Sequence, residues 1–129
     1  DFDPVVVAND AMALKKYYAD LGYFDADVQH DTSEADGKVT VVFKIKEGLR
    51  YKVRSQILEG NEVLTQQQLF EDKKLESGKF FSARHLQQDV AKMKEKYDDL
   101  GRLFSRVEPT PRFLEDPGWV DVVYHVDED

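Results

Sequence analysis

The chain has 129 residues, of which 41% are hydrophobic and 34% charged, and its formal net charge is −8. This balance is typical of a globular protein rather than a disordered one. Lysine and arginine form no cluster of the kind that phosphate binding requires, so nucleic acid is not an expected partner. The absence of cysteine excludes disulfides and cysteine-ligated metals. No apolar run approaches the length of a membrane-spanning helix.

The first predicted helix covers residues 3–21. Its apolar residues recur at helical spacing and form one stripe: Val7, Ala11, Leu14, Tyr18 and Leu21. Asp3 is the predicted N-cap, Pro4 takes the first helical position, and Gly22 ends the helix. The chain begins directly at this cap, and we therefore expect it to be a fragment of a longer protein.

Two strands and a tight turn are predicted after this helix. Residues 23–29 alternate between apolar and polar side chains, which predicts a half-buried strand. Asp36 and Gly37 predict a turn. Residues 38–46 alternate again, with four apolar side chains facing inward: Val39, Val41, Phe43 and Ile45.

Residues 47–50 form a short connection without a flexible tract, so we expect a restricted range of orientations across it. A strand is predicted at residues 51–58, with one face made by Tyr51, Val53, Ser55 and Ile57. Gly60 and Asn61 end this strand, because both residues tolerate a positive φ.

A short and then a long helix are predicted next. Thr65 and Gln68 form a capping box, and the short helix is expected to end near Leu75. Gly78 follows it. The long helix begins after the N-cap Ser82, and its apolar stripe is Leu86, Val90, Met93, Tyr97 and Leu100.

Two further features of the long helix have counterparts in the first one. Gly101 ends the long helix as Gly22 ends the first, and a positive φ is expected there. Asp89 lies beside the stripe, as Asp10 does in the first helix. We expect each of these carboxylates to make a structural hydrogen bond.

The chain closes with a predicted hairpin. Residues 102–108 form its first strand, and residues 120–126 form its second. Pro109 and Pro111 follow the first strand, and proline is confined to edge strands and bulges. We therefore expect the first strand at the edge of the sheet and the last strand at its centre.

The two halves of the chain repeat the same pattern, which predicts tandem modules at residues 1–48 and 49–129. Eight positions of the first module stand 79 residues before their counterparts: Phe2, Asp3, Asp10, Leu14, Tyr18, Leu21, Gly22 and Val28 answer Phe81, Ser82, Asp89, Met93, Tyr97, Leu100, Gly101 and Val107. After a two-residue difference in length, Glu47 and Gly48 answer Glu128 and Asp129.

The second module carries the signature residues Gly60, Asn61, Gly78, Asp89, Tyr97 and Gly101, and the first carries Gly22, the counterpart of Gly101, and Gly48. On these residues the second module resembles a POTRA (polypeptide-transport-associated) domain. The first looks like the back part of a preceding POTRA domain, without its first strand and helix. The resemblance implies an α+β fold of tandem β-α-α-β-β modules, each a three-stranded sheet packed on two helices, with only α-β-β in the first.

No constellation for catalysis, cofactor binding or metal binding emerges from the sequence, and we do not expect an enzyme. The histidines, His30, His85 and His125, lack the spacing of metal ligands and are interpreted as surface residues. The acidic pairs lie at helix ends, in loops and at the terminus, where solvated carboxylates are expected.

The candidate binding site is an unpaired strand edge, because such an edge can accept another extended chain. In the second module it comprises Arg102, Leu103, Phe104, Ser105, Arg106, Val107 and Glu108. In the first module its counterpart comprises Tyr23, Asp25, Asp27 and Gln29. The groove between this strand and the stripe of the long helix is expected to accept alternate side chains of the incoming chain.

The resemblance also implies a function. POTRA domains occur on the periplasmic side of BamA-type outer-membrane assembly factors and two-partner secretion transporters, whose β-barrel would lie C-terminal to this chain. We therefore expect a periplasmic module that receives unfolded outer-membrane or secreted polypeptides, or accessory assembly proteins. The alternative is a structural spacer between a barrel and its partners. For the incomplete first module we expect loose ordering or pairing with a second copy of the chain.

Overall fold

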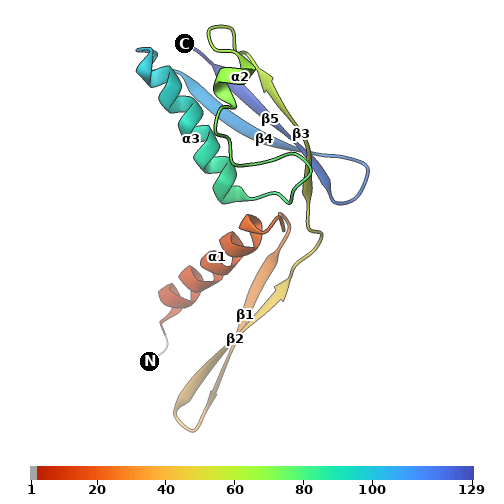
Figure 1. Cartoon of the computed structure of the whole chain (residues 1–129). Coiled ribbons are helices and arrows are strands. Elements are labelled where there is room, and N and C mark those ends of the chain that lie inside the picture. The colour runs from red at the N-terminus through yellow and green to blue at the C-terminus, as the bar shows by residue number, and fades with distance from the viewer. Residues whose placement is uncertain (1–2) are drawn as a thin grey trace.

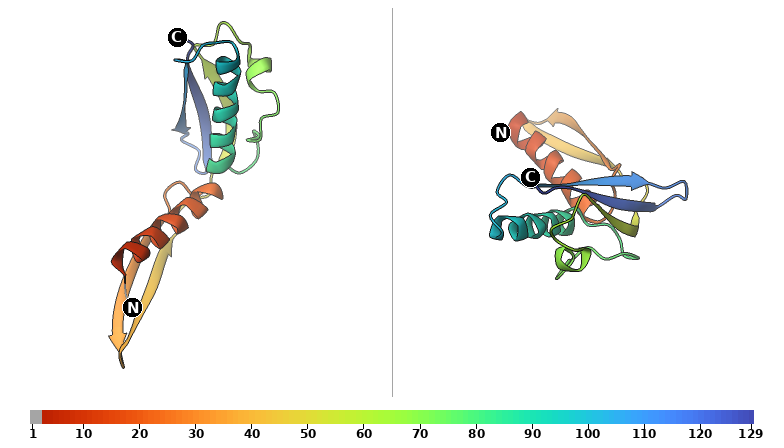
Figure 2. Two further views of the ribbon diagram at one scale, coloured as in Figure 1. Left: turned by 90° about the vertical axis from the view of Figure 1, so that its left-hand side faces the viewer. Right: turned by 90° about the horizontal axis from the view of Figure 1, so that it is seen from above.

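The computed structural model describes residues 3–129, so the Phe2 position of the repeat lies outside the described residues. Two units are joined end to end (Figure 1, Figure 2). The N-terminal unit contains α1 (Pro4–Asp20), β1 (Asp27–Ala35) and β2 (Lys38–Lys46). The C-terminal unit contains β3 (Lys52–Glu59), α2 (Gln66–Leu69), α3 (Ala83–Asp99), β4 (Arg106–Phe113) and β5 (Trp119–Asp127). The α+β class and the two element orders are as predicted.

Both long helices begin at the predicted caps. The Asp3 carboxylate accepts a hydrogen bond from the Val5 backbone N–H at 2.9 Å, and the Ser82 hydroxyl accepts one from the His85 N–H at 3.2 Å. Each side chain thus satisfies one amide that the helix itself leaves without a partner. The prediction for the last stripe residue, Leu100, is wrong. It follows the final helical turn, beyond the core, and is 53% exposed.

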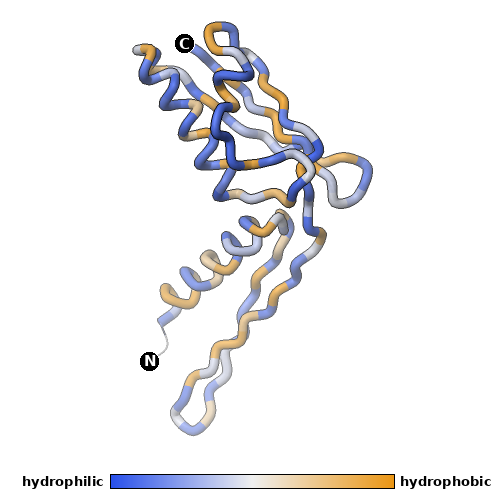
Figure 3. Tube along the Cα trace, in the orientation of Figure 1, coloured by the Kyte–Doolittle hydropathy of each residue, from blue (hydrophilic) through white to orange (hydrophobic). Residues whose placement is uncertain are grey.

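In the N-terminal unit, β1 and β2 form an antiparallel hairpin with α1 along one side (Figure 2). Asp36 (φ 53°) and Gly37 (φ 75°) make the predicted turn. Hydrophobic and hydrophilic residues alternate along most of β2 (Figure 3), whereas β1 is hydrophilic apart from Val28 and Ala35. Val7 of α1 and Ala26 of the corner after it are buried, whereas most strand side chains remain exposed.

The C-terminal unit is built on a three-stranded sheet with the order β3-β5-β4. The last strand, β5, is central, parallel to β3 and antiparallel to β4. This arrangement confirms β4 as an edge strand. The helix α3 covers one face of the sheet, which we call the inner face. Its core comprises Tyr51, Val53, Leu69, Leu75, Phe81, Leu86, Met93, Tyr97, Val107, Val120, Val122, Tyr124 and Val126.

A β-bulge in β3 overturns the predicted sidedness of that strand. The register with β5 shifts between Val53 and Gln56, so one extra residue of β3 lies opposite β5. Beyond the bulge the inward side chains are Gln56 and Leu58. Gln56 accepts a hydrogen bond from the Tyr124 hydroxyl at 2.6 Å, and Ile57 pairs with Val123 on the outer face instead.

The buried carboxylate of Asp121 holds this bulge. Its Oδ1 accepts hydrogen bonds from the Ser55 N–H at 3.1 Å and from the Ser55 hydroxyl at 2.8 Å. Arg54 forms a two-point ion pair with the same carboxylate, at 3.0 and 2.6 Å. Arg112 of β4 approaches it from the other side at 3.6 Å. One side chain of the central strand therefore joins all three strands.

The short helix α2 is only one turn long, so the prediction that it reaches Leu75 is wrong. Its capping box is present, with Thr65 and Gln68 bonded reciprocally. After α2, Asp72 adopts a positive φ of 59°, which a helix cannot continue through. Asp89 of α3 then accepts the backbone N–H groups of Lys74 at 2.7 Å and Leu75 at 2.9 Å. Asp89 thus makes the expected structural hydrogen bonds, whereas its counterpart in α1, Asp10, is exposed.

The units meet where the end of α1 approaches the start of α3. The Asp20 carboxylate accepts hydrogen bonds from the Ser82 hydroxyl at 2.5 Å and from the Arg84 N–H at 3.1 Å. The Ser82 hydrogen bond is the main reason that the pKa of Asp20 lies below its usual value. A carboxylate at this position is also favoured by the helix dipole of α3.

The corner after α1 completes this interface. The Gly22 carbonyl accepts a hydrogen bond from the Tyr51 N–H at 2.9 Å, and a Cβ at Gly22 would lie 3.0 Å from the Tyr51 carbonyl oxygen. The Phe24 ring lies 4.2 Å from that of Phe81, and 5.5 and 5.2 Å from those of Tyr51 and Phe113. The interface between the units therefore consists of hydrogen bonds and an aromatic cluster.

Among residues 3–129, no helix combines the length and the apolar character needed to cross a bilayer.

Two glycines with similar backbone conformations should respond differently to the same substitution. Gly60 (φ 91°) would place a Cβ 2.2 Å from the Val126 carbonyl oxygen, whereas a Cβ on Gly101 (φ 79°) would meet nothing within 4 Å. Gly101→Ala should lower the free energy of unfolding by about 1 kcal/mol, through backbone strain alone. Gly60→Ala should lower it by more than about 3 kcal/mol, because backbone must also move. Urea unfolding of both variants is the measurement, and equal losses would contradict this account.

Asp121 should make stability depend on pH. Hydrogen bonds from Arg54 hold the pKa of this carboxyl below its usual 3.8. The stabilisation is therefore present above about pH 3.8 and is lost as the pH falls through the lower folded-state value. Asp121→Asn should be strongly destabilised at pH 7 and should approach the parent chain in stability as the pH falls below the folded-state pKa of Asp121. Glu115→Gln, at an exposed loop carboxyl, is the control. A pH-independent difference between Asp121→Asn and the parent would refute the assignment.

Candidate functional site

Only part of the predicted binding edge of the second module lies in a strand. Arg106, Val107 and Glu108 belong to the edge strand β4, but residues 102–105 do not. These residues form a closed corner after α3, in which the Arg102 N–H donates to the Tyr97 carbonyl and the Ser105 N–H donates to the Arg102 carbonyl. The predicted strand therefore began four residues too early, because the alternation in the corner resembles that of a strand.

The same correction applies to the first module. Tyr23 and Asp25 lie in the corner after α1, and only Asp27 and Gln29 belong to β1. The ring of Tyr23 packs against Tyr18 at 5.7 Å, in an edge-to-face arrangement. These corner residues are held by contacts with α1 and with the other unit, so their backbone is not an open edge.

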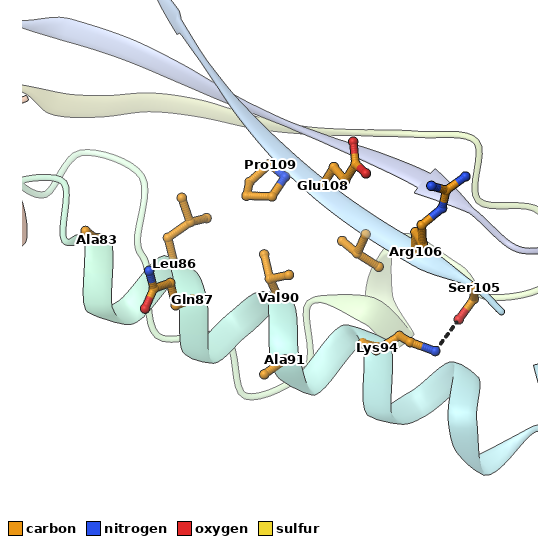
Figure 4. A pocket seen from close by; sticks show the side chains of 11 residues that line it. Ala83, Leu86, Gln87, Val90, Ala91, Lys94, Ser105, Arg106, Glu108 and Pro109 are labelled. Carbon is orange, nitrogen blue, oxygen red and sulfur yellow. Dashed lines mark hydrogen bonds between the residues drawn. The ribbon is translucent and has the colours of Figure 1, made fainter. Parts of the chain in front are cut away.

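An apolar groove runs between α3 and the edge strand β4, as the sequence predicted. Its volume is about 580 Å³. Leu86 and Val90 of α3 project toward Pro109 of β4 across it (Figure 4). Small side chains, Ala83 and Ala91, also line the helix side of the groove and leave space there. The groove therefore offers apolar walls beside an exposed strand.

Lys94 closes one end of this groove. Its Nζ lies 2.6 Å from an Asp98 carboxylate oxygen and 2.9 Å from the Leu103 carbonyl oxygen. Figure 4 shows its third contact, with the Ser105 hydroxyl at 3.2 Å. Ser105 is buried, so this contact fixes the start of β4 against α3. The spacing between helix and strand at this end is thus set by a hydrogen-bonded cation.

The outward edge of β4 carries more hydrogen-bond acceptors than donors. The Leu114 N–H donates to the Trp119 carbonyl, so the even-numbered residues of this strand direct their amides toward β5. The odd-numbered residues direct their backbone groups away from β5, toward the free edge. Two of them, Pro109 and Pro111, have no N–H. Val107 and Phe113 provide the remaining outward donors, while all four outward carbonyls are available.

The opposite edge of the sheet is partly covered. The Gly78 N–H donates to the Val53 carbonyl at 2.7 Å, and the Val53 N–H donates to the Lys79 carbonyl at 2.9 Å. The Phe81 N–H donates to the Tyr51 carbonyl in the same way. The segment before α3 therefore occupies the first half of the outer edge of β3. This leaves β4 as the longer free edge of the three-stranded sheet.

The described residues contain no group of three or more His, Asp or Glu side chains placed to hold a metal ion. His125 lies 3.2 Å from a Glu59 carboxylate oxygen on the surface of the sheet. His30 is exposed and His85 half-buried.

Several residues of the site were not predicted from the sequence. Ala83, Gln87, Ala91 and Lys94 line the groove beside the predicted stripe residues. The alanines at the margin of the helix stripe were an available signal, because small residues on a packed helix face leave space beside them. No local pattern marks Lys94, whose role depends on how the corner folds back.

Comparison with known proteins identifies a family. The POTRA family, described as a surface antigen variable number repeat, matches residues 2–48 and 51–129. No curated protein matches the chain.

Solved structures share the fold. The chain superposes on POTRA domains 3–5 of Haemophilus influenzae BamA with a TM-score of 0.77 at 23% identity, over 100% of this chain and 52% of that one. Haemophilus ducreyi BamA lacking POTRA domains 1–3 gives 0.78 at 23% identity, over 100% and 24% of the two chains. POTRA domains 1–2 of the periplasmic domain of Anabaena Omp85 give 0.55 at 23% identity, over 99% and 75%. The chain thus spans about half or less of the two BamA chains.

Restoring an outward amide on β4 should increase association between copies of the chain. Pro111→Thr adds one donor to the exposed edge, and unpaired edges promote association between chains. We expect sedimentation velocity to show concentration-dependent association of this variant beyond that of the parent. The control is Thr110→Val, which changes the neighbouring residue whose amide faces β5. Equal association of the parent and both variants would show that the prolines do not protect this edge.

Proposed function

Because the chain belongs to the POTRA family, we propose that it is a periplasmic scaffold of an outer-membrane protein assembly or secretion factor. In this proposal, extended polypeptides bind at β4 and place side chains in the groove between β4 and α3. The clients are unfolded outer-membrane or secreted polypeptides, or accessory assembly proteins. The chain itself performs no catalysis. We also take residues 1–48 and 49–129 as its two domains.

The observation that carries the proposal is the apolar groove beside a free strand edge. An added strand gains affinity from main-chain hydrogen bonds and selectivity from pockets for alternate side chains. β4 supplies the first through its outward carbonyls, and the groove lined by Leu86, Val90 and Pro109 supplies the second. The main-chain hydrogen bonds require no particular client sequence and the groove requires only apolar side chains, which suits a receptor for many polypeptides.

The geometry favours weak binding. Pro109 and Pro111 remove two outward donors, so an incoming strand donates hydrogen bonds to β4 more often than it accepts them. Ordering an extended chain also costs conformational entropy, which offsets much of the gain from a few hydrogen bonds. Weak binding is useful for a scaffold, because the client must leave again.

The similar structures support the location. The Anabaena fragment is described as part of a periplasmic domain, and the Haemophilus chains as BamA. We extend the periplasmic location and the assembly role from those proteins to this chain.

A spacer without client binding is the second candidate, and the contacts between the units favour it. Asp20, Gly22 and Phe24 hold the two units in one arrangement, as a spacer requires. The two candidates differ in one measurable property, which is whether the groove binds an extended peptide.

A charge in the groove should abolish peptide binding. The probe is a nine-residue peptide of alternating valine and threonine with a lysine at each end, titrated into the isotopically labelled chain. The parent should show NMR shifts along β4 and the facing side of α3. Ala91→Glu should weaken binding at least about tenfold, because an incoming apolar side chain would desolvate the carboxylate.

The matched control is Gln88→Glu, which adds the same carboxylate on α3 outside the groove and should bind like the parent. Shifts confined to the exposed side of α3, or equal binding by Ala91→Glu, would leave the spacer as the function.

A further inference from the structure

Four cationic side chains gather at the start of β3, beside the junction of the two units. We call Arg50, Lys52, Lys74 and Lys79 the basic cluster. The first two stand at the beginning of β3, and the other two come from the segment between α2 and α3. That segment returns to β3 (Figure 1), where the Val53 N–H donates to the Lys79 carbonyl. The fold therefore joins cations that are more than twenty residues apart in the sequence.

The charges of the basic cluster are not compensated by carboxylates. Within residues 3–129, none of its four side chains forms an ion pair. By contrast, an aspartate pairs with each of four other arginines: Arg54, Arg84, Arg106 and Arg112. In a chain whose formal net charge is −8, the cluster is thus a local positive surface that attracts an anionic partner.

An exposed aromatic ring lies among these cations. Phe80 is 41% exposed, and Lys52 and Phe80 face each other in an antiparallel bridge. The Arg50 Cζ lies 3.6 Å from the centroid of the Phe80 ring, and the Lys52 Nζ lies 5.1 Å from it. Cation–π attraction of this kind holds both cations beside the ring. The cluster therefore combines positive charge with a small apolar surface.

The cluster borders a hollow of about 230 Å³ between the two units. Arg50, Lys74, Lys79 and Phe80 line it on one side, and residues 20–21 of the N-terminal unit line it on the other. The carboxylate of residue 20 is already engaged by the start of α3, through the Ser82 hydroxyl and the Arg84 N–H. The hollow thus offers an anionic side chain several cations whose charges are still available.

We propose that the basic cluster binds an acidic segment of a partner protein. A carboxylate of the segment enters the hollow between Arg50, Lys74 and Lys79, and a neighbouring apolar side chain packs on Phe80. Exposed charges contribute little individually, so affinity comes from several of them together and falls as salt screens them. Because the hollow is lined by both units, the bound segment contacts both.

A protein segment fits this surface better than an anionic bilayer does. Glu76 lines the same hollow, and the rest of the chain is strongly acidic. A broad anionic surface would meet those carboxylates together with the cations, whereas a narrow segment can place its carboxylates at the cations alone. A hollow also accepts a projecting side chain, which a flat surface does not supply.

The basic cluster is separate from the proposed peptide groove. β3 and β4 are the two edges of the sheet, with β5 between them, and the groove lies along β4. No residue lines both the groove and the hollow. An acidic segment and an extended client can therefore bind at the same time, and either site can fail its test without the other.

The test uses a short peptide of alternating glutamate and glycine around one central leucine. Titrated into the isotopically labelled chain, it should shift the NMR signals of residues 50–52 and 74–80 and leave those of β4 unchanged. A peptide with lysine in place of each glutamate is the control and should not bind. Raising the salt concentration from about 0.05 M to about 0.5 M should weaken binding at least about tenfold.

Two pairs of charge reversals locate the site. Lys74→Glu with Lys79→Glu should weaken peptide binding at least about tenfold, because two attractive contacts become repulsive. Both side chains are exposed, so the fold should be kept. The matched control is Lys38→Glu with Lys92→Glu, at exposed lysines outside the hollow. This pair changes the net charge by the same amount and should retain most of the binding.

Three results would overturn the proposal. One is an absence of peptide binding by the parent chain at low salt. Another is an equal loss in the two pairs, since net charge alone would then explain the binding. The third is binding to vesicles of phosphatidylglycerol and phosphatidylcholine that is tighter than peptide binding and that the Lys74→Glu, Lys79→Glu pair abolishes, because the partner of the cluster would then be a membrane.

Discussion

The hydrogen bonds between the Asp20 carboxylate and the N-terminus of α3 connect the two halves of this protein. A helix N-terminus leaves amides without partners, and here one of them is satisfied by a residue from the other unit. Because α3 also forms the core of its own unit and one wall of the groove, the same contact places the groove relative to α1. The close approach at Gly22 and the aromatic cluster around Phe24 make this arrangement specific, since both depend on the shape of the contact.

Within the C-terminal unit, two carboxylates on opposite faces perform related tasks. Asp121 on the outer face joins the three strands, and Asp89 on α3 holds the segment after α2 through its backbone amides. Both anchor irregular backbone, a bulge in one case and a coil segment in the other. The edge strand β4 is left outside these anchors. It is held on one side by β5 and bordered on the other by the groove, which is why it remains open to an additional strand.

How far the sequence predicts this structure depends on how local each signal is. The helix caps at Asp3, Ser82 and Thr65 are read from a few adjacent residues, and all three are correct. The central position of β5 follows from the prolines of its neighbour. The bulge in β3 could not be predicted, because it depends on Asp121, which is 66 residues away from Ser55.

Nonlocal contacts also explain why β1 and β4 begin four residues later than predicted. Residues 23–26 and 102–105 alternate between apolar and polar side chains as strands do, but they form the turn after each helix. In the candidate site, the groove was predicted from the helix stripe and the strand edge. Lys94 was not, because its partners belong to the corner that the sequence assigned to a strand.

The parallel pairing of β3 with β5 has a consequence for how the chain acquires its structure. The hairpin of β1 and β2 is closed by a two-residue turn and needs only neighbouring residues, so it can form while the rest of the chain is still being made. The C-terminal sheet also contains a local hairpin, β4–β5, but β3 finds its strand partner only when the last strand has been made. The segment between β3 and β5 must be closed into a loop before the two strands can pair. The entropy cost of closing this long loop slows folding. During that interval β3, with its apolar residues Val53, Ile57 and Leu58, has no strand partner, so the C-terminal unit is the part of the chain that stays unfolded longest.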